Sequence, residues 1–196
     1  MRRLSEKVKD FAIRRHNWVR QEYGKGVPYS VHLEMVADFA EKFSYVLSEE
    51  DRDLAVAAAW GHDLIEDTRV TYNDLGKLFG WKFAEVVFCC TEQRGRNREE
   101  RHGEAYYDLL SKNSIGKFVK LCDICANFSN SKENSNSMYK KYKKEFPKVK
   151  ENYTKKVSTN LYGTFYILSK SRFFRLFLYP IVTTRLLDNR KQDLYG

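Results

Sequence analysis

Histidine and carboxylate side chains gather where the most apolar stretch of the sequence ends. Residues 54–60 are apolar throughout, and they lead through a glycine into His62 and Asp63, with Glu66 and Asp67 close behind. Charged side chains that follow a buried helix must be hydrated, paired or bound to a cation, because an isolated charge is costly away from water. At helical spacing, His62 and Glu66 share one face and the two aspartates lie about 100° around the helix.

Two polar residues elsewhere in the chain could join this cluster. His32 stands near the start of the amphipathic segment 30–46, and Asp123 lies inside the otherwise apolar segment 118–126. An aspartate in such a setting is rarely buried unless it is paired or binds a metal. Taken alone, a histidine at a position such as His32 is more often a surface residue or a capped histidine of the core than a metal ligand.

Combined, these residues supply two imidazoles and two carboxylates: His32, His62, Asp63 and Asp123. That ligand set suits an octahedral site with open positions for a divalent transition metal. Manganese or iron fits it better than structural zinc does. The alternative for Asp123 is a simple ion pair with Lys120 or Arg14, and for Glu66 and Asp67 it is a solvated helix end.

Helices are the elements that must position these groups. Periodic apolar residues predict helices over 5–20, 30–46, 51–64, 71–79, 83–90, 99–111 and 115–129, with a turn at 24–28. Thr71 is expected to cap one of them, with Asp74 as its partner. The predicted fold is therefore all-α, a single helical bundle over residues 1–138 followed by an extension over 139–196.

Three motifs in this bundle resemble those of the HD-domain hydrolases of the RelA/SpoT type, which include small stand-alone members. Residues 62–68 are similar to the family's His-Asp-x-x-Glu-Asp-Thr, and residues 28–32 resemble its Pro-Tyr-x-x-His. Residues 120–127 resemble Lys-Leu-Ala-Asp-x-x-x-Asn. Order and approximate spacing agree over residues 8–130, about two thirds of the chain.

The resemblance implies an HD-domain helical bundle that holds one manganese ion, or another divalent transition metal, through His32, His62, Asp63 and Asp123. It also implies that Glu66 and Asp67 orient and deprotonate the attacking water and that Asn127 contacts the nucleotide. The family's reaction removes pyrophosphate from the 3′ position of guanosine tetra- or pentaphosphate, leaving GDP or GTP.

Phosphate recognition is where the sequence departs from the family. Ile124 follows the last aspartate, where the family usually has Arg or Lys. The segment before Pro-Tyr, often rich in basic residues, here offers Arg20 and Lys25 with an acid between them. A second basic loop carries the remaining candidates for substrate binding: Arg94, Arg96, Arg98 and Arg101. A merely solvated basic loop is an equally good interpretation.

Charge is distributed unevenly along the chain. The net charge of +9 divides into −1 for residues 1–139 and +10 for residues 140–196. Because Lys170, Arg172 and Arg175 interrupt its apolar run, the basic, aromatic-rich extension predicts no transmembrane span. Its expected roles are contact with an anionic membrane surface or self-association. Packing on the core or across a dimer interface is favoured over membrane contact.

Three functions remain open from the sequence. The first is a metal-dependent pyrophosphohydrolase of guanosine tetraphosphate. The second keeps the metal chemistry but acts on another nucleotide phosphate ester, and the third is a non-enzymatic protein that binds RNA or membranes. The near-neutral core argues against a stable nucleic-acid partner. With no apolar run of signal-peptide length at the N-terminus and only four cysteines, the chain is expected in the cytoplasm.

Overall fold

The computed structural model describes residues 2–134, 137–140 and 142. The chain divides into two units, Met1–Asn134 and Ser135–Gly196, and the fold below is that of the first. In the second unit, the described residues are helical. The predicted extension over 139–196 lies almost wholly outside the described residues, so its boundary and its expected roles stay predictions.

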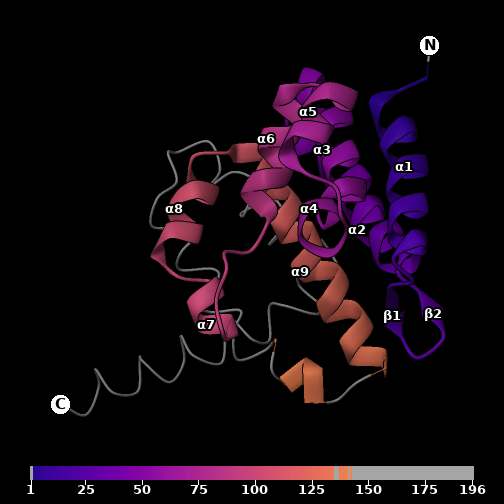
Figure 1. Ribbon diagram of the computed structural model, residues 1–196, viewed down its shortest axis with the longest axis vertical. Coiled ribbons are helices and arrows are strands. Elements are labelled where there is room, and N and C mark those ends of the chain that lie inside the picture. Colours follow the sequence, from indigo (N-terminus) through magenta and orange to yellow (C-terminus); the bar gives the residue numbers. More distant parts are fainter. Residues whose placement is uncertain (1, 135–136, 141, 143–196) are drawn as a thin grey trace, which may run out of the picture. The chain divides into compact units, whose positions relative to one another are not determined.

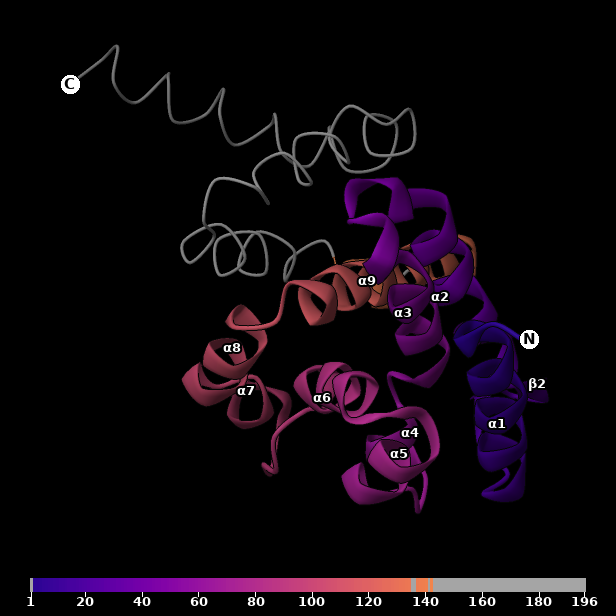
Figure 2. The same cartoon turned by 90° about the horizontal axis from the view of Figure 1, so that it is seen from above.

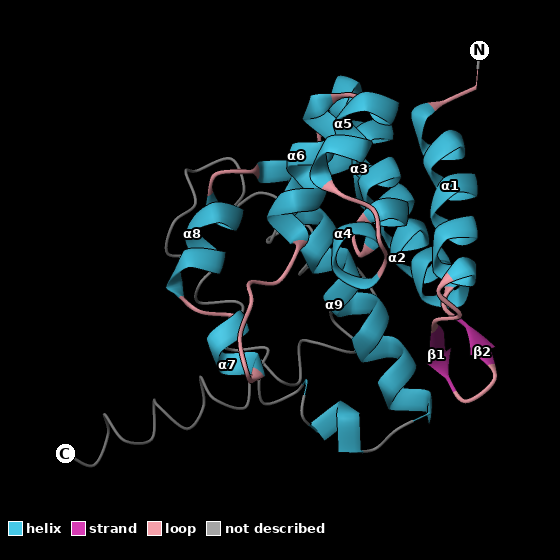
Figure 3. Cartoon of the chain, viewed as in Figure 1, coloured by secondary structure: helices cyan, strands magenta, loops and turns pink. Residues whose placement is uncertain are grey.

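Apart from two short strands, all the regular secondary structure of the described residues is helical, which confirms the all-α prediction (Figures 1 and 3). The elements, in order, are α1 (Leu4–Trp18), β1 (Glu22–Gly24), β2 (Val27–Pro28), α2 (Ser30–Phe43), η1 (Ser44–Val46), α3 (Glu49–Gly61), α4 (Leu64–Asp67), α5 (Tyr72–Phe79), α6 (Trp81–Cys90), α7 (Arg98–Arg101), α8 (Glu104–Ser111) and α9 (Ser114–Asn134).

The apolar helix α3 lies at the centre of the first unit. It packs against α1, α2, α6 and α9, which surround it when the molecule is viewed from above (Figure 2). Ala55, Ala57, Ala58 and Ala59 are fully buried on it. Small side chains let neighbouring helices approach closely, so the sequence of α3 both fills the core and fixes the distance to its neighbours.

Two local predictions about turns hold in the structure. Thr71 caps α5 in a reciprocal pair of bonds, in which its hydroxyl accepts from the Asp74 amide at 3.2 Å and its own amide donates to Asp74 Oδ2 at 2.9 Å. The predicted turn at 24–28 is the tip of a hairpin in which β1 and β2 pair antiparallel. Gly26 supplies the positive φ of 75° that this turn requires.

Two helices that the sequence predicts as continuous are interrupted in the structure. The helix expected over 51–64 ends at Gly61, and α4 begins only at Leu64, because Asp63 leaves helical geometry with φ −98° and ψ 3°. The helix expected over 99–111 is divided into α7 and α8, since Gly103 has extended backbone at the start of α8. Apolar periodicity continues through both interruptions and therefore hides them.

No helix in the part of the chain that the structure describes is long and apolar enough to cross a membrane.

We predict that Gly61→Ala destabilises the bundle next to the site. An added Cβ would lie 2.8 Å from Phe83 Cζ and 3.3 Å from Val8 Cγ1, and both side chains are buried and cannot swing aside. Overpacking of this kind costs about 1–3 kcal/mol. Equilibrium denaturation should therefore show a lower midpoint for this variant.

Gly24→Ala is the matched control, because a Cβ there meets no atom within 4 Å. We expect its free energy of unfolding to stay within about 0.5 kcal/mol of the parent chain. Equal losses for the two variants would contradict the packing argument.

Candidate active site

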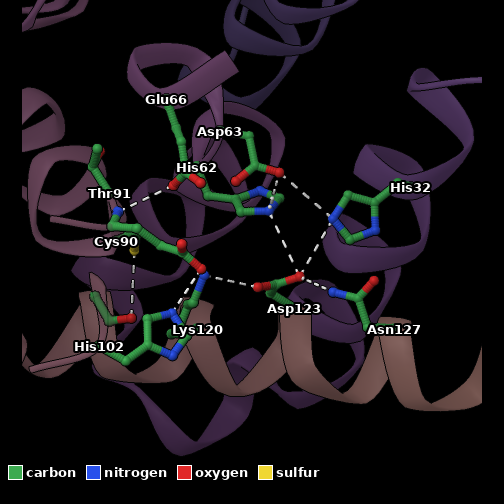
Figure 4. Close-up of polar contacts among 12 residues, drawn as sticks. His32, His62, Asp63, Glu66, Cys90, Thr91, His102, Lys120, Asp123 and Asn127 are labelled. Atoms are coloured by element: carbon green, nitrogen blue, oxygen red, sulfur yellow. Dashed lines mark hydrogen bonds and ion pairs between the residues drawn. The ribbon is translucent and has the colours of Figure 1, made fainter. Parts of the chain in front are cut away.

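Four residues predicted to bind a metal come from three different places in the fold and meet at one point (Figure 4). His32 lies in the first turn of α2, and Asp123 lies in the middle of α9. His62 and Asp63 form the interruption between α3 and α4. All four are buried, with at most 8% of their surface exposed.

The distances among these side chains are short. Nε2 of His32 lies 3.6 Å from Asp63 Oδ2 and 3.3 Å from Asp123 Oδ1. Nε2 of His62 lies 2.9 Å from Asp63 Oδ2 and 3.8 Å from Asp123 Oδ1. The two imidazoles therefore direct the same ring nitrogen toward the same pair of carboxylates.

The His62 ring shows what this arrangement can accept. Its Nδ1 lies 2.9 Å from the Ala59 carbonyl oxygen, which can only accept a hydrogen bond, so Nδ1 carries the proton. In the neutral ring, the buried Nε2 then presents a lone pair, and it has no hydrogen-bond partner. A lone pair that faces carboxylates is repelled unless a cation or a proton lies between them.

A divalent cation fits this donor set. His32, His62 and Asp123 each offer one ligand atom, and these atoms lie within 4.8 Å of one another. Asp63 adds a second carboxylate next to both histidines. Two imidazole nitrogens and two carboxylate oxygens are ligands typical of divalent transition metals.

Electrostatics agree with a site built for positive charge. Burial lowers the pKa of His32, but the Asp123 and Asp63 carboxylates outweigh burial and raise this pKa to about 9. Burial raises the pKa of Asp123, yet the Lys120 ammonium and the two imidazoles bring it well below its usual range. The centre therefore favours ionised carboxylates and a neighbouring positive charge.

Hydrogen bonds from outside the centre orient the two carboxylates. The Tyr29 hydroxyl donates to Asp63 Oδ2 at 2.5 Å, and the Asn127 amide donates to Asp123 Oδ1 at 2.5 Å. Lys120 Nζ lies 3.0 Å from Asp123 Oδ2, so the ion pair considered from the sequence exists. It uses the other oxygen of Asp123 and leaves the histidine-facing oxygen in place. Such outer contacts fix the direction of metal-ligating groups.

Tyr23, on the hairpin, braces the histidine side of the centre. Its ring stacks on His32 with centroids 4.8 Å apart, and its hydroxyl donates to Asn127 Oδ1 at 3.1 Å. The hairpin thus connects α2 to α9 directly at the centre. Asn127 was predicted only through the family resemblance, and its side chain lies between Tyr23 and Asp123.

Asp67 is held by a polar relay that sequence spacing did not reveal. The Gln21 amide nitrogen donates to Asp67 Oδ2 at 2.7 Å. The Gln21 amide oxygen accepts from His16 Nδ1 at 2.6 Å, and His16 is fully buried. Gln21 and His16 lie 46 and 51 positions before Asp67, so no local pattern could connect them.

Glu66 is bonded to a loop that sequence spacing did not connect with it. Its carboxylate accepts a hydrogen bond from the Glu92 amide at 3.0 Å, at the beginning of the loop that follows α6. His62 instead meets Asp63, although adjacent residues of a continuous helix diverge by about 100°. The helical spacing expected over 62–67 does not hold, because the backbone leaves the helix at Asp63.

Both acids have raised pKa values. Burial and the nearby Asp63 carboxylate raise the pKa of Asp67. Glu66 is exposed to solvent, yet the protein that surrounds its carboxylate desolvates it enough to raise its pKa as well. A carboxylate with a raised pKa is a better proton acceptor, which suits general base chemistry.

The basic residues predicted to bind phosphate do not gather at one point. Arg20 and Lys25 are exposed on the hairpin side, whereas Arg94, Arg96 and Arg101 belong to the loop around α7, across α9 in Figure 1. Arg96 pairs with Glu100 at 3.2 Å, and Arg101 pairs with Glu92 at 2.9 Å. The side chain of Arg98 lies outside the described part.

Known proteins were compared with the whole chain. No protein-family model matches it. Guanosine-3′,5′-bis(diphosphate) 3′-pyrophosphohydrolase MESH1 of Drosophila melanogaster is 25% identical over 154 residues, which cover 79% of this chain and 82% of that protein. The protein of the same name from Danio rerio is 28% identical over 114 residues, which cover 58% of this chain and 61% of that protein.

A solved structure shares the fold. It is described as a metazoan ortholog of SpoT that hydrolyses ppGpp, and it aligns with a TM-score of 0.64 at 21% identity, covering 85% of this chain and 94% of the other. These matches confirm the resemblance drawn from the three motifs: the chain has the all-α fold of the small stand-alone HD-domain hydrolases of the RelA/SpoT type and is similar to them in sequence.

Proposed function

We propose that this chain is a metal-dependent hydrolase that removes pyrophosphate from the 3′ position of guanosine tetra- or pentaphosphate. One observation carries the proposal: two buried imidazole nitrogens face two carboxylates, with two further acids of raised pKa close by. The names of the sequence relatives support the choice of substrate.

His32, His62, Asp63 and Asp123 would hold the metal, for which manganese is the first candidate. A divalent ion there supplies Lewis acidity, which lowers the pKa of a coordinated water and neutralises phosphoryl charge. Tyr29, Asn127 and Lys120 keep the carboxylates directed at the centre through the bonds described above.

Asp67 and Glu66 handle the proton of the attacking water in this proposal. Asp67 is held by Gln21 with one oxygen, so its remaining lone pairs can orient a water molecule and accept its proton. Glu66 occupies the solvent side, where an acid can pass a proton to bulk water. Their raised pKa values make both better bases than free carboxylates.

Substrate contacts come from three groups of residues in this proposal. Asn127 lies at the centre and would contact the nucleotide. The cations that the sequence offers for its phosphates are Arg20 and Lys25 on the hairpin side, and Arg94, Arg96, Arg98 and Arg101 on the α7 side. Guanidinium groups make bidentate bonds to phosphate oxygens, which suits a substrate with phosphates at two ends.

Metal-dependent hydrolysis is the first test. With Mn²⁺, the purified chain should release pyrophosphate from guanosine tetraphosphate, and chelation should abolish the release until Mn²⁺ is restored. His62→Ala and Asp63→Ala should each lower kcat by at least about 100-fold, because each removes a metal ligand. Mn²⁺ should also raise the Tm of the parent chain and leave that of the variants nearly unchanged.

Asp38→Ala is the matched control, since Asp38 is exposed on the same helix as His32. It should retain the parent's activity. A panel of other nucleotides belongs in the same assay, because Ile124 and the scattered cations keep a different phosphate ester open. Activity on another nucleotide alone would change the proposed substrate. Inactivity on every nucleotide would refute the proposal that the chain is an enzyme.

The pH profile should report the relay through Gln21. The Gln21 N–H group lowers the pKa of Asp67, so Gln21→Leu should raise that pKa. A base must be ionised to act, and activity is lost as the pH falls through its pKa. The acidic limb of kcat/KM should therefore move to higher pH in Gln21→Leu.

Asn17→Leu provides the comparison, because Asn17 is exposed near the end of α1. Its profile should superimpose on that of the parent chain. An unshifted acidic limb in Gln21→Leu would exclude Asp67 as the base whose ionisation limits the reaction.

A further inference from the structure

The loop that follows α6 contains an acid that the proposed function does not use. The side chain of Glu92 is 12% exposed, and Arg101 and His102 hold it. Arg101 Nε forms an ion pair with Glu92 Oε2 at 2.9 Å, and His102 Nε2 donates to Glu92 Oε1 at 2.6 Å. Each carboxylate oxygen of Glu92 therefore contacts a residue at the far end of the loop, Arg101 or His102.

Backbone bonds close the same loop. The Gln93 amide donates to the Arg101 carbonyl at 3.3 Å, and the Arg101 amide donates to the Asn97 carbonyl at 3.1 Å. The His102 ring stacks on Tyr106, a buried residue of α8, with centroids 5.0 Å apart. The two ends of the loop are thus joined to each other and anchored to the core.

Glu92 also contacts Glu66 through its backbone amide. Its amide donates to Glu66 Oε2 at 3.0 Å. This amide belongs to irregular backbone, which can direct a bond only if the loop around it is held in place. The Glu92 carboxylate supplies that restraint, because it binds Arg101 and His102 while its own amide faces Glu66.

We propose that Glu92 is a positioning residue for Glu66, with Arg101 and His102 acting through it. The inference rests on the proposed function, since it concerns one of the acids of that reaction. It also assigns Arg101 to the support of Glu66 instead of to phosphate. Although burial raises the pKa of Glu92, the bond from His102 and the nearby charges of Lys120 and Arg101 together lower it below its usual value.

Glu92→Gln tests the proposal because it keeps the size of the side chain and removes its charge. We expect kcat to fall by about 10-fold or more, as for other outer contacts of an active site, with KM within about 2-fold of the parent value. Asp51→Asn is the control, since it makes the same change in the 2.8 Å ion pair with Lys82 elsewhere in the fold. It should leave both constants unchanged.

A double-mutant cycle separates positioning from general weakening. If Glu92 acts through Glu66, Glu92→Gln should have no further effect on kcat in a Glu66→Gln background. An equal loss in both backgrounds would overturn the proposal. So would a rise in KM without a fall in kcat, because that pattern belongs to a phosphate contact.

Arg101 gives a second route if Glu92→Gln folds poorly. Arg101→Ala should lower kcat without raising KM, and Arg101→Lys should recover most of the loss because it keeps the charge beside Glu92. A rise in KM for Arg101→Ala alone would return this residue to phosphate binding and overturn its assignment here.

Amide hydrogen exchange supplies a readout that needs no activity. In the metal-free chain, the Glu92 and Gln93 amides should exchange at least about 10-fold faster in Glu92→Gln than in the parent or in Asp51→Asn. Unchanged exchange would overturn the proposal even in an active enzyme. A parent chain that hydrolyses no nucleotide would instead refute the proposed function and leave the exchange result to judge the loop.

Discussion

The direction of one imidazole nitrogen governs the site. The Ala59 carbonyl accepts a hydrogen bond from Nδ1 of His62, so Nε2 faces Asp63 and Asp123 inside a buried space. That arrangement is unfavourable by itself, because lone pairs and carboxylates repel one another in a poorly hydrated environment. Positive charge at the centre turns the same geometry into a favourable one. The surrounding fold holds the two histidines and the two aspartates together despite this repulsion.

Holding them requires both rigid and irregular backbone. The alanines of α3 bring α1, α2, α6 and α9 close, which fixes the distance between His32 on α2 and Asp123 on α9. The interruption between α3 and α4 then does what no continuous helix can do, since it directs His62 and Asp63 at one point. The close contact of Gly61 with Phe83 places this interruption against the core. Rigidity of the bundle and local irregularity are both needed.

The sequence revealed the four residues of the centre but not the contacts that direct them. His32, His62, Asp63 and Asp123 could be identified because acids and histidines in apolar segments need a compensating partner, and because the motifs around them resemble a known family. Gln21 and Glu92 carried no such signal. They are ordinary polar residues next to turns. Gln21 lies 46 positions from its partner Asp67, and Glu92 lies 26 positions from its partner Glu66. Contacts made by loops depend on the folded arrangement, which apolar periodicity does not encode.

The two acids beyond the centre differ in a way that bears on their roles. Asp67 is tied to α1 through Gln21 and the buried His16, so its position follows from the core of the bundle. Glu66 is tied to a loop that is closed by the contacts of Glu92 with Arg101 and His102. An acid fixed by the core suits the step that demands constant geometry, the orientation of the attacking water. An acid fixed by a charged loop depends instead on the ion pair between Glu92 and Arg101, so its position follows the charges of that loop and not the packing of the bundle.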